Sequence, residues 1–277
     1  MKNTKNTLVV NPLTLLVVIF YLFSGYKKDL VSLLLVFLIH ELGHIFFISL
    51  FRLKILKIEI YPFGGIIKIY NKLNYSVIKN ILISSGGIIF QLILEIINIY
   101  LIKNNKIHFY NHLLLLINLL PISPLDGNKI VMYALMYVIP YVYSIIFSRV
   151  ISIIALVIYL FISHYYRSLN IMLTTIMIIN IYRDIKSIKG YKKKFLLERY
   201  LNDFSYLKIK KYKKINLNLI HLNRYTIFGT KNMQSEREIL GKMFDKQAYF
   251  WYYLIRLKGF PGKTALKRFW LKHICVP

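Results

Sequence analysis

Long apolar runs are the feature that most constrains how this chain can fold. Residues 30–51, 77–102 and 140–165 each approach or exceed the ~18 apolar residues that are typical of a membrane span. Backbone polar groups in a bilayer must be satisfied within the segment, so such runs fold as helices. With 57% hydrophobic side chains among 277 residues, the sequence predicts an all-α polytopic membrane protein.

Charges set the expected number of spans and their orientation. Basic residues flank both ends of the apolar region, at Lys2 and Lys5 and from Arg183 onward, which predicts that both termini are cytoplasmic. An even number of spans is then required, and six are favoured, although a break at Arg149 would give seven. The six expected spans cover residues 9–24, 30–51, 77–102, 109–120, 140–165 and 168–182.

A polar stretch separates the second and third expected spans. Hydrophobic and polar residues alternate over residues 56–61, and a similar run follows at 66–70. Between them lies Pro62-Phe63-Gly64-Gly65, which is typical of a turn. We therefore expect a small β-hairpin at the cytoplasmic membrane surface.

The C-terminal part of the chain is strongly basic. Residues 182–277 contain 23 Lys and Arg against 6 Asp and Glu, within a formal net charge of +27 for the whole chain. Cytoplasmic loops explain such charge in a membrane protein, so we expect no direct nucleic-acid partner. We divide the chain into a membrane domain, residues 1–185, and a short basic cytoplasmic region, residues 186–277. Two interpretations of this region stay open. Residues 248–255 could lie at the membrane interface, or the whole region could be a small folded or partly disordered tail.

A His-Glu pair lies inside the second apolar run. His40 and His44 are four residues apart, so on a helix both imidazoles project from one face, one turn apart. That spacing suits two ligands of one zinc ion, and Glu41 beside them can act as a general base. The competing interpretation is a pair of histidines packed in a helix bundle, but polar residues within a span are costly without a function.

A catalytic zinc ion needs a third protein ligand. The single cysteine, Cys275, rules out a cysteine-based zinc site. The other histidines, of which most lie near expected span ends, are less suitable than Asp126, which follows a span broken by Pro121 and Pro124. A carboxylate there could bind zinc, although Asp-Gly by itself also occurs in ordinary turns.

These two motifs together resemble the site-2 protease family of intramembrane metalloproteases. His40-Glu41-Leu42-Gly43-His44 matches its His-Glu-x-x-His motif, and residues 118–127 match its Asn-x-x-Pro-x-x-Pro-x-Asp-Gly element. The resemblance implies that His40, His44 and Asp126 bind one Zn²⁺ and that Glu41 activates water. We expect substrate contacts from Asn118 and Pro124 of the second motif. We also expect them from Gly64 and Gly65 of the predicted hairpin turn.

The hairpin turn, the six-span layout and residues 195–200 are similar to the subfamily of stage IV sporulation protein FB. That resemblance implies a membrane-associated substrate, the pro-form of the sporulation factor sigma-K, in the mother-cell membrane around the forespore. It also implies inhibitory membrane-protein partners. Residues 201–277 depart from the subfamily, because they are too short and too basic for its nucleotide-sensing CBS domain.

Three other functions stay open. A general site-2 protease would act on anti-sigma factors or signal-peptide remnants. A membrane metal transporter could use the same ligands transiently, but the sequence shows neither internal repeats nor several acidic relay sites. A scaffold without activity would not need Glu41, since zinc binding alone does not require that residue.

The role of Asn118 is also open. Its side chain could hold the substrate or the oxyanion, or could make a structural hydrogen bond.

Overall fold

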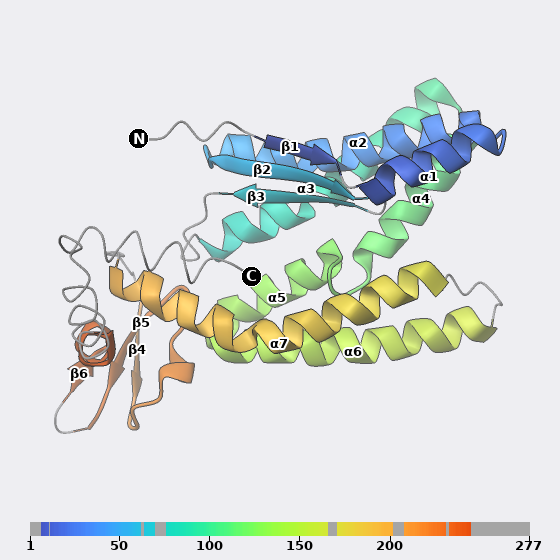
Figure 1. The fold of residues 1–277 in the computed structure, drawn as a ribbon. Coiled ribbons are helices and arrows are strands. Elements are labelled where there is room, and N and C mark those ends of the chain that lie inside the picture. Colours follow the sequence, from blue (N-terminus) through green and yellow to red (C-terminus); the bar gives the residue numbers. More distant parts are fainter. Residues whose placement is uncertain are drawn as a thin grey trace, which may run out of the picture.

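The computed structural model describes residues 7–10, 12–61, 64–69, 76–165, 171–201, 208–230 and 233–244. Helices make up most of this part of the chain (Figure 1). The expected segment at 248–255 lies outside the described residues. The helices run as α1 (Pro12–Phe23), α2 (Lys27–Leu50), α3 (Val77–Ile97) with a π-helical end η1 (Asn98–Ile102), α4 (Asn105–Leu119), α5 (Asp126–Val138), α6 (Tyr141–Tyr165) and α7 (Ile171–Leu201).

Three of the described helices are long and apolar enough to cross a membrane. They cover Lys27–Leu50, Val77–Ile102 and Tyr141–His164, which confirms three of the six expected spans. Each buries only a minority of its apolar stretch inside the protein. The remaining apolar side chains face outward, as expected for contact with lipid.

The other three expected spans differ from the prediction. Helix α1 has 12 residues and α4 has 15, so at 1.5 Å per residue both fall short of a hydrocarbon core of ~30 Å. Residues 9 and 10, expected at the start of the first span, belong instead to strand β1 (Thr7–Val10). Helix α7 has 31 residues and runs far past the expected end at 182 into the basic region.

A three-stranded sheet lies alongside α2 (Figure 1). It contains the expected hairpin, formed by β2 (Ile55–Tyr61) and β3 (Gly64–Ile69), and β1 pairs parallel with β2. The strand order is β1-β2-β3, so β3 is an edge strand. Gly64 and Gly65, expected in the turn, pair with Tyr61 and Ile60 as part of β3. The prediction of an all-α protein with a single hairpin was therefore wrong in detail.

Helices α2 and α3 approach closely at two glycines. A Cβ atom on Gly86 would lie 2.5 Å from the carbonyl oxygen of Gly43, so only glycine fits at this crossing. Small residues allow this kind of backbone contact in membrane helices, where packing rather than hydrophobicity drives association. The crossing brings the histidine face of α2 against α3.

Helix α6 continues through Arg149 without a break. The guanidinium Nη2 atom lies 3.2 Å from Oδ2 of Asp184 on α7, and Ser123 donates a hydrogen bond to the same carboxylate. A buried cation is tolerated when it is paired and hydrogen-bonded. The alternative of a split at Arg149 is therefore excluded by the continuous helix.

The described part of the basic region is folded. Strands β4 (Ile209–Tyr212), β5 (Tyr225–Phe228) and β6 (Gln234–Ser235) form a second sheet, with a 3-10 turn η2 (Leu217–Leu219) between the first two strands. Its apolar side chains join one core with the ends of α5, α6 and α7. Tyr141 of α6 stacks on Phe195 of α7 with a ring-centroid distance of 4.0 Å in this core. Helix α7 passes through 185 and 186 without interruption, so the division at this point stays a prediction.

Candidate metal centre

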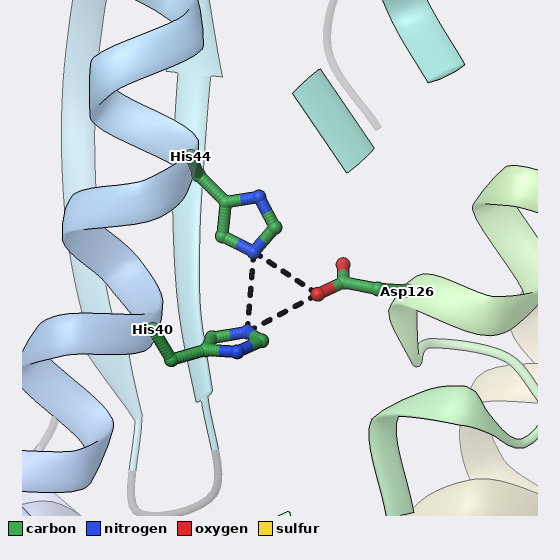
Figure 2. Close-up of side chains that lie close together, drawn as sticks. All are labelled: His40, His44 and Asp126. Carbon is green, nitrogen blue, oxygen red and sulfur yellow. Dashed lines mark hydrogen bonds and ion pairs between the residues drawn. The ribbon is translucent and has the colours of Figure 1, made fainter. Parts of the chain in front are cut away.

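Three donor atoms from two distant parts of the chain meet at one point. His40 and His44 project from α2, and Asp126 projects from the first turn of α5 toward them (Figure 2). The Nε2 atoms of the histidines lie 3.1 Å apart. They lie 3.1 and 3.0 Å from Oδ2 of Asp126. The result is a nearly equilateral triangle of buried donor atoms.

The chain breaks and restarts in a way that aims Asp126 at α2. Helix α4 ends at Leu119, and α5 begins at Asp126 after a loop that contains Pro121 and Pro124. Inside this loop the main-chain N–H of Ser123 donates to Oγ of Ser152 on α6 over 3.1 Å. The expected irregular backbone is thus buried in protein, which is where a membrane protein tolerates it.

Hydrogen bonds at the far side of each imidazole indicate its tautomer. Nδ1 of His40 lies 3.0 Å from Oε1 of Gln91, and Nδ1 of His44 lies 2.7 Å from the carbonyl oxygen of Ile83. Both partners on α3 are acceptors, so each Nδ1 carries the proton and donates it. Each Nε2 then presents its lone pair to the centre of the triangle.

This donor set fits a zinc ion. Two imidazole lone pairs and a carboxylate are common ligands of catalytic zinc, at about 2.0–2.2 Å from the metal. Three donors about 3 Å apart can all reach an ion at that distance and leave an open position on one side. The two Nδ1 hydrogen bonds are the outer contacts that usually orient such ligands. Without a cation, three electron-rich atoms would face one another in a buried space.

The second carboxylate oxygen of Asp126 has its own partner. Nζ of Lys129, one turn along α5, lies 2.8 Å from Oδ1 of Asp126. The Lys129 side chain is half exposed, whereas Asp126 is buried. Lys129 therefore fixes which oxygen of Asp126 faces the histidines.

Glu41 lies on the strand side of this triangle. Its Oε1 atom accepts a hydrogen bond of 2.8 Å from the main-chain N–H of Gly65 in β3. A Cβ atom on Gly65 would lie 2.5 to 2.9 Å from the three atoms of the Glu41 carboxylate group. The edge strand therefore touches the expected general base directly, and only glycine leaves room for that contact.

The remaining expected site residues are placed less tightly. Asn118 is buried in the last turn of α4, and Pro124 is exposed in the loop before Asp126. Gly64 begins β3 next to Gly65. The roles of these residues in substrate binding stay predictions.

Sequence reasoning missed Gln91, the carbonyl group of Ile83 and Lys129. Gln91 could have been noticed, because it is a polar residue within an apolar span and such residues usually face protein. A main-chain carbonyl gives no signal in the sequence. Lys129 is an ordinary surface residue until the position of Asp126 is known.

Comparison with known proteins agrees with this arrangement. Residues 29–107 match the family model of peptidase family M50. This range contains the His-Glu pair and Gln91, and the structure adds Asp126 from beyond it. Residues 29–107 are therefore similar to peptidase family M50.

Two individual proteins are similar to this chain. Stage IV sporulation protein FB of Bacillus subtilis (strain 168) is 32% identical over 130 residues, which cover 44% of this chain and 45% of that protein. The match therefore spans less than half of the relative's length. The site-2 protease from Methanocaldococcus jannaschii is 20% identical, with a TM-score of 0.45, and the likeness covers 74% of this chain and 96% of that one.

Proposed function

We propose that this chain is an intramembrane zinc metalloendopeptidase that cleaves a membrane-associated protein. The observation that carries the proposal is the buried triangle of His40, His44 and Asp126 with Glu41 next to it. His40, His44 and Asp126 would hold a zinc ion, which would supply Lewis acidity toward a peptide carbonyl and a water molecule. The match of residues 29–107 to the model of peptidase family M50 and the three candidate membrane spans support the same proposal.

The chain's own residues provide the proton transfers. Glu41 accepts the proton of the attacking water and holds it at a carboxylate oxygen until the leaving amine takes it. Gly65 keeps one of those oxygens oriented through its N–H. Lys129 holds Asp126 in place from the opposite side. We also propose that Asn118 hydrogen-bonds the substrate main chain or the oxyanion.

A substrate helix must open before its peptide bond can react, because its backbone is hydrogen-bonded within the helix. We propose that the opened segment pairs with β3. This strand is at an edge of its sheet, and Gly65 turns its N–H toward Glu41 rather than toward β2. An added strand would run past Glu41, with Gly64, Gly65 and Pro124 beside it.

The finer proposal is that the substrate is the precursor of sigma-K. It rests on the resemblance of the hairpin turn and the region after the last span to the sporulation subfamily, and on the similarity to stage IV sporulation protein FB. Cytoplasmic termini, a mother-cell membrane location and inhibitory membrane partners belong to this proposal. Cleavage of anti-sigma factors or signal-peptide remnants is the alternative within the same chemistry.

Co-expression with tagged pro-sigma-K from the same organism tests the proposal. We expect cleavage by the wild type, none by Glu41→Gln, and the same zinc content in both. Glu238→Gln is a matched control, since Glu238 is exposed in the C-terminal region, and it should cleave normally. Equal cleavage by the wild type and Glu41→Gln would remove the proposed base. Cleavage of an anti-sigma factor but not of pro-sigma-K would favour the alternative substrate.

A further inference from the structure

A second group of metal-binding side chains lies between α3 and α4. It consists of Glu95 on α3 and of His108 and His112 on α4. Their nearest donor atoms all lie within 4.8 Å of one another. Glu95 is buried, whereas the two histidines are about half exposed. None of these residues takes part in the chemistry proposed above.

The order of residue types in this group resembles that of the first, although its histidines face the carboxylate with Nδ1 rather than Nε2. Two histidines four residues apart on one helix face a carboxylate from another helix, as His40 and His44 face Asp126. Nδ1 of His108 contacts Oε1 of Glu95. Nδ1 of His112 lies 3.6 Å from Oε2 of Glu95. Imidazole and carboxylate donors together suit Zn²⁺ among the common divalent ions.

The carboxylate is held in place before any ion binds. Nδ2 of Asn111, which is fully buried, lies 2.7 Å from Oε2 of Glu95 and 3.0 Å from the carbonyl oxygen of Gln91. A second set of hydrogen bonds fixes the connection between the two helices. The side chain of Asn98 accepts from the N–H of Asn104 at 3.1 Å and donates to its carbonyl oxygen at 3.2 Å.

We propose that Glu95, His108 and His112 bind a second Zn²⁺ ion, which clamps α3 to α4. The exposed sides of the two histidines leave room for water as the fourth ligand and for direct entry from solvent. Nδ1 of His112 also lies 3.2 Å from the carbonyl oxygen of His108, a contact that requires a proton on Nδ1. Zinc binding through that atom replaces this proton, so the ion and the hydrogen bond exclude each other.

The two sites are joined by one turn of α3. Gln91 binds His40 through its side chain, and its carbonyl oxygen binds Asn111, which in turn binds Glu95. Gln91 and Glu95 are four residues apart and so lie ~6 Å apart along the helix axis. A zinc ion at the second site therefore steadies the residue that orients His40.

Zinc counting tests this proposal. Full-length chains in detergent, all with Glu41→Gln to prevent self-cleavage, are equilibrated with ZnCl₂ and desalted, and zinc per chain is measured by mass spectrometry. We expect two ions in the parent, one in His108→Ala/His112→Ala and one in His40→Ala/His44→Ala. His164→Ala, an exposed histidine at the end of α6, is the matched control and should keep two.

The outcomes separate this inference from the proposed function. One ion in the parent that is lost only in His40→Ala/His44→Ala, or two ions in His108→Ala/His112→Ala, would overturn the second site and leave the first unaffected. Loss of an ion only in His108→Ala/His112→Ala would support the second site and contradict the proposed active site. Glu95→Gln provides an independent check, because it should also hold one ion while keeping the side-chain volume of Glu95.

Discussion

The main-chain N–H of Gly65 in the edge strand β3 donates a 2.8 Å hydrogen bond to the Glu41 carboxylate on α2. This contact links β3, the proposed binding strand for the substrate, to Glu41, the proposed base that moves a proton from water to the leaving amine. The carboxylate is therefore positioned by the hairpin as well as by its own helix. A change in the hairpin should affect catalysis even though the metal ligands are untouched.

Gly65→Ala should lower the cleavage rate roughly 10- to 100-fold, because the added Cβ would displace the Glu41 carboxylate and impair general base catalysis. Zinc content should be unchanged, since Gly65 does not contact the ligands. Gly190→Ala in α7 is the control, because a Cβ there meets nothing within 4 Å. A cleavage rate of Gly65→Ala equal to that of Gly190→Ala would mean that the contact has no catalytic role.

Asp126→Asn should lose the zinc ion of the first site and all proteolytic activity, because a neutral amide is a much poorer zinc ligand than a carboxylate. The measurement is zinc per chain together with cleavage of the co-expressed substrate. Asp29→Asn, at the start of α2 where Asp29 pairs with Lys106, serves as the control. Full zinc content in Asp126→Asn would show that another group completes the site.

Removal of the His40 partner tests the role of Gln91. Gln91→Leu should weaken zinc binding or activity about 10- to 100-fold, as is usual when an acceptor behind a metal-binding histidine is lost. Gln91→Glu keeps an acceptor oxygen and should restore most of the loss. A competition titration against a zinc chelator measures the affinity, and equal affinities in Gln91→Leu and the wild type would show that the hydrogen bond does not matter.

Gly86→Val should destabilise the pair of helices that carries the site. The larger side chain would collide with the backbone of Gly43, and overpacking of this kind costs about 1–3 kcal/mol. We expect a lower thermal midpoint in detergent and a parallel loss of zinc binding. An unchanged midpoint would show that α2 and α3 can separate at this crossing without loss of stability.

The C-terminal sheet should lose stability as the pH falls. Burial of His221, together with the nearby Arg224, Lys210 and Arg199, lowers its pKa to about 4 from a usual value of 6.5. The unfolded chain then binds the proton more readily than the folded chain, so stability is lost between pH 6.5 and pH 4. Oη of Tyr212 lies 2.8 Å from Nε2 of His221 and donates to the neutral ring.

Limited proteolysis across that pH range measures this effect. The wild type should become more susceptible around residues 208–244 as the pH is lowered, and His221→Asn should show a weaker dependence. The comparison matters because Glu236 also lies in this core, beside Arg199. Burial raises the pKa of Glu236, so this group by itself would make the fold more stable as the pH falls, which opposes the effect of His221. Identical pH profiles of the two proteins would exclude His221 as the cause.

The parts of the site that could be predicted from the sequence are those with local spacing. His40 and His44 are one helical turn apart, and Asp126 follows a proline-rich break, so each motif was visible by itself. The sequence also predicts the hairpin, because its two strands alternate and a proline and two glycines stand between the alternating runs, although the glycines belong to β3. The spans at 30–51, 77–102 and 140–165 were visible from hydrophobicity alone, and the structure contains a helix long enough to span at each.

The features that were missed depend on contacts between distant residues. The sequence predicts a helix from residue 9, because Val9 and Val10 are as apolar as the span that follows, whereas their pairing with β2 makes them part of strand β1. The partner of Arg149 is Asp184, on a different helix, so the sequence left a break in α6 open. The roles of Gln91 and Lys129 likewise depend on the packing of α3 against α2 and α5.

The position of β3 has a consequence for how substrates are selected. Strand pairing uses main-chain N–H and C=O groups, which nearly every residue offers, so an edge strand distinguishes poorly between side chains. A protease that binds its substrate in this way would accept many sequences and would depend on which membrane helices unwind near its hairpin. Its choice of target would then reflect the local stability of the target helix more than a consensus around the cleaved bond.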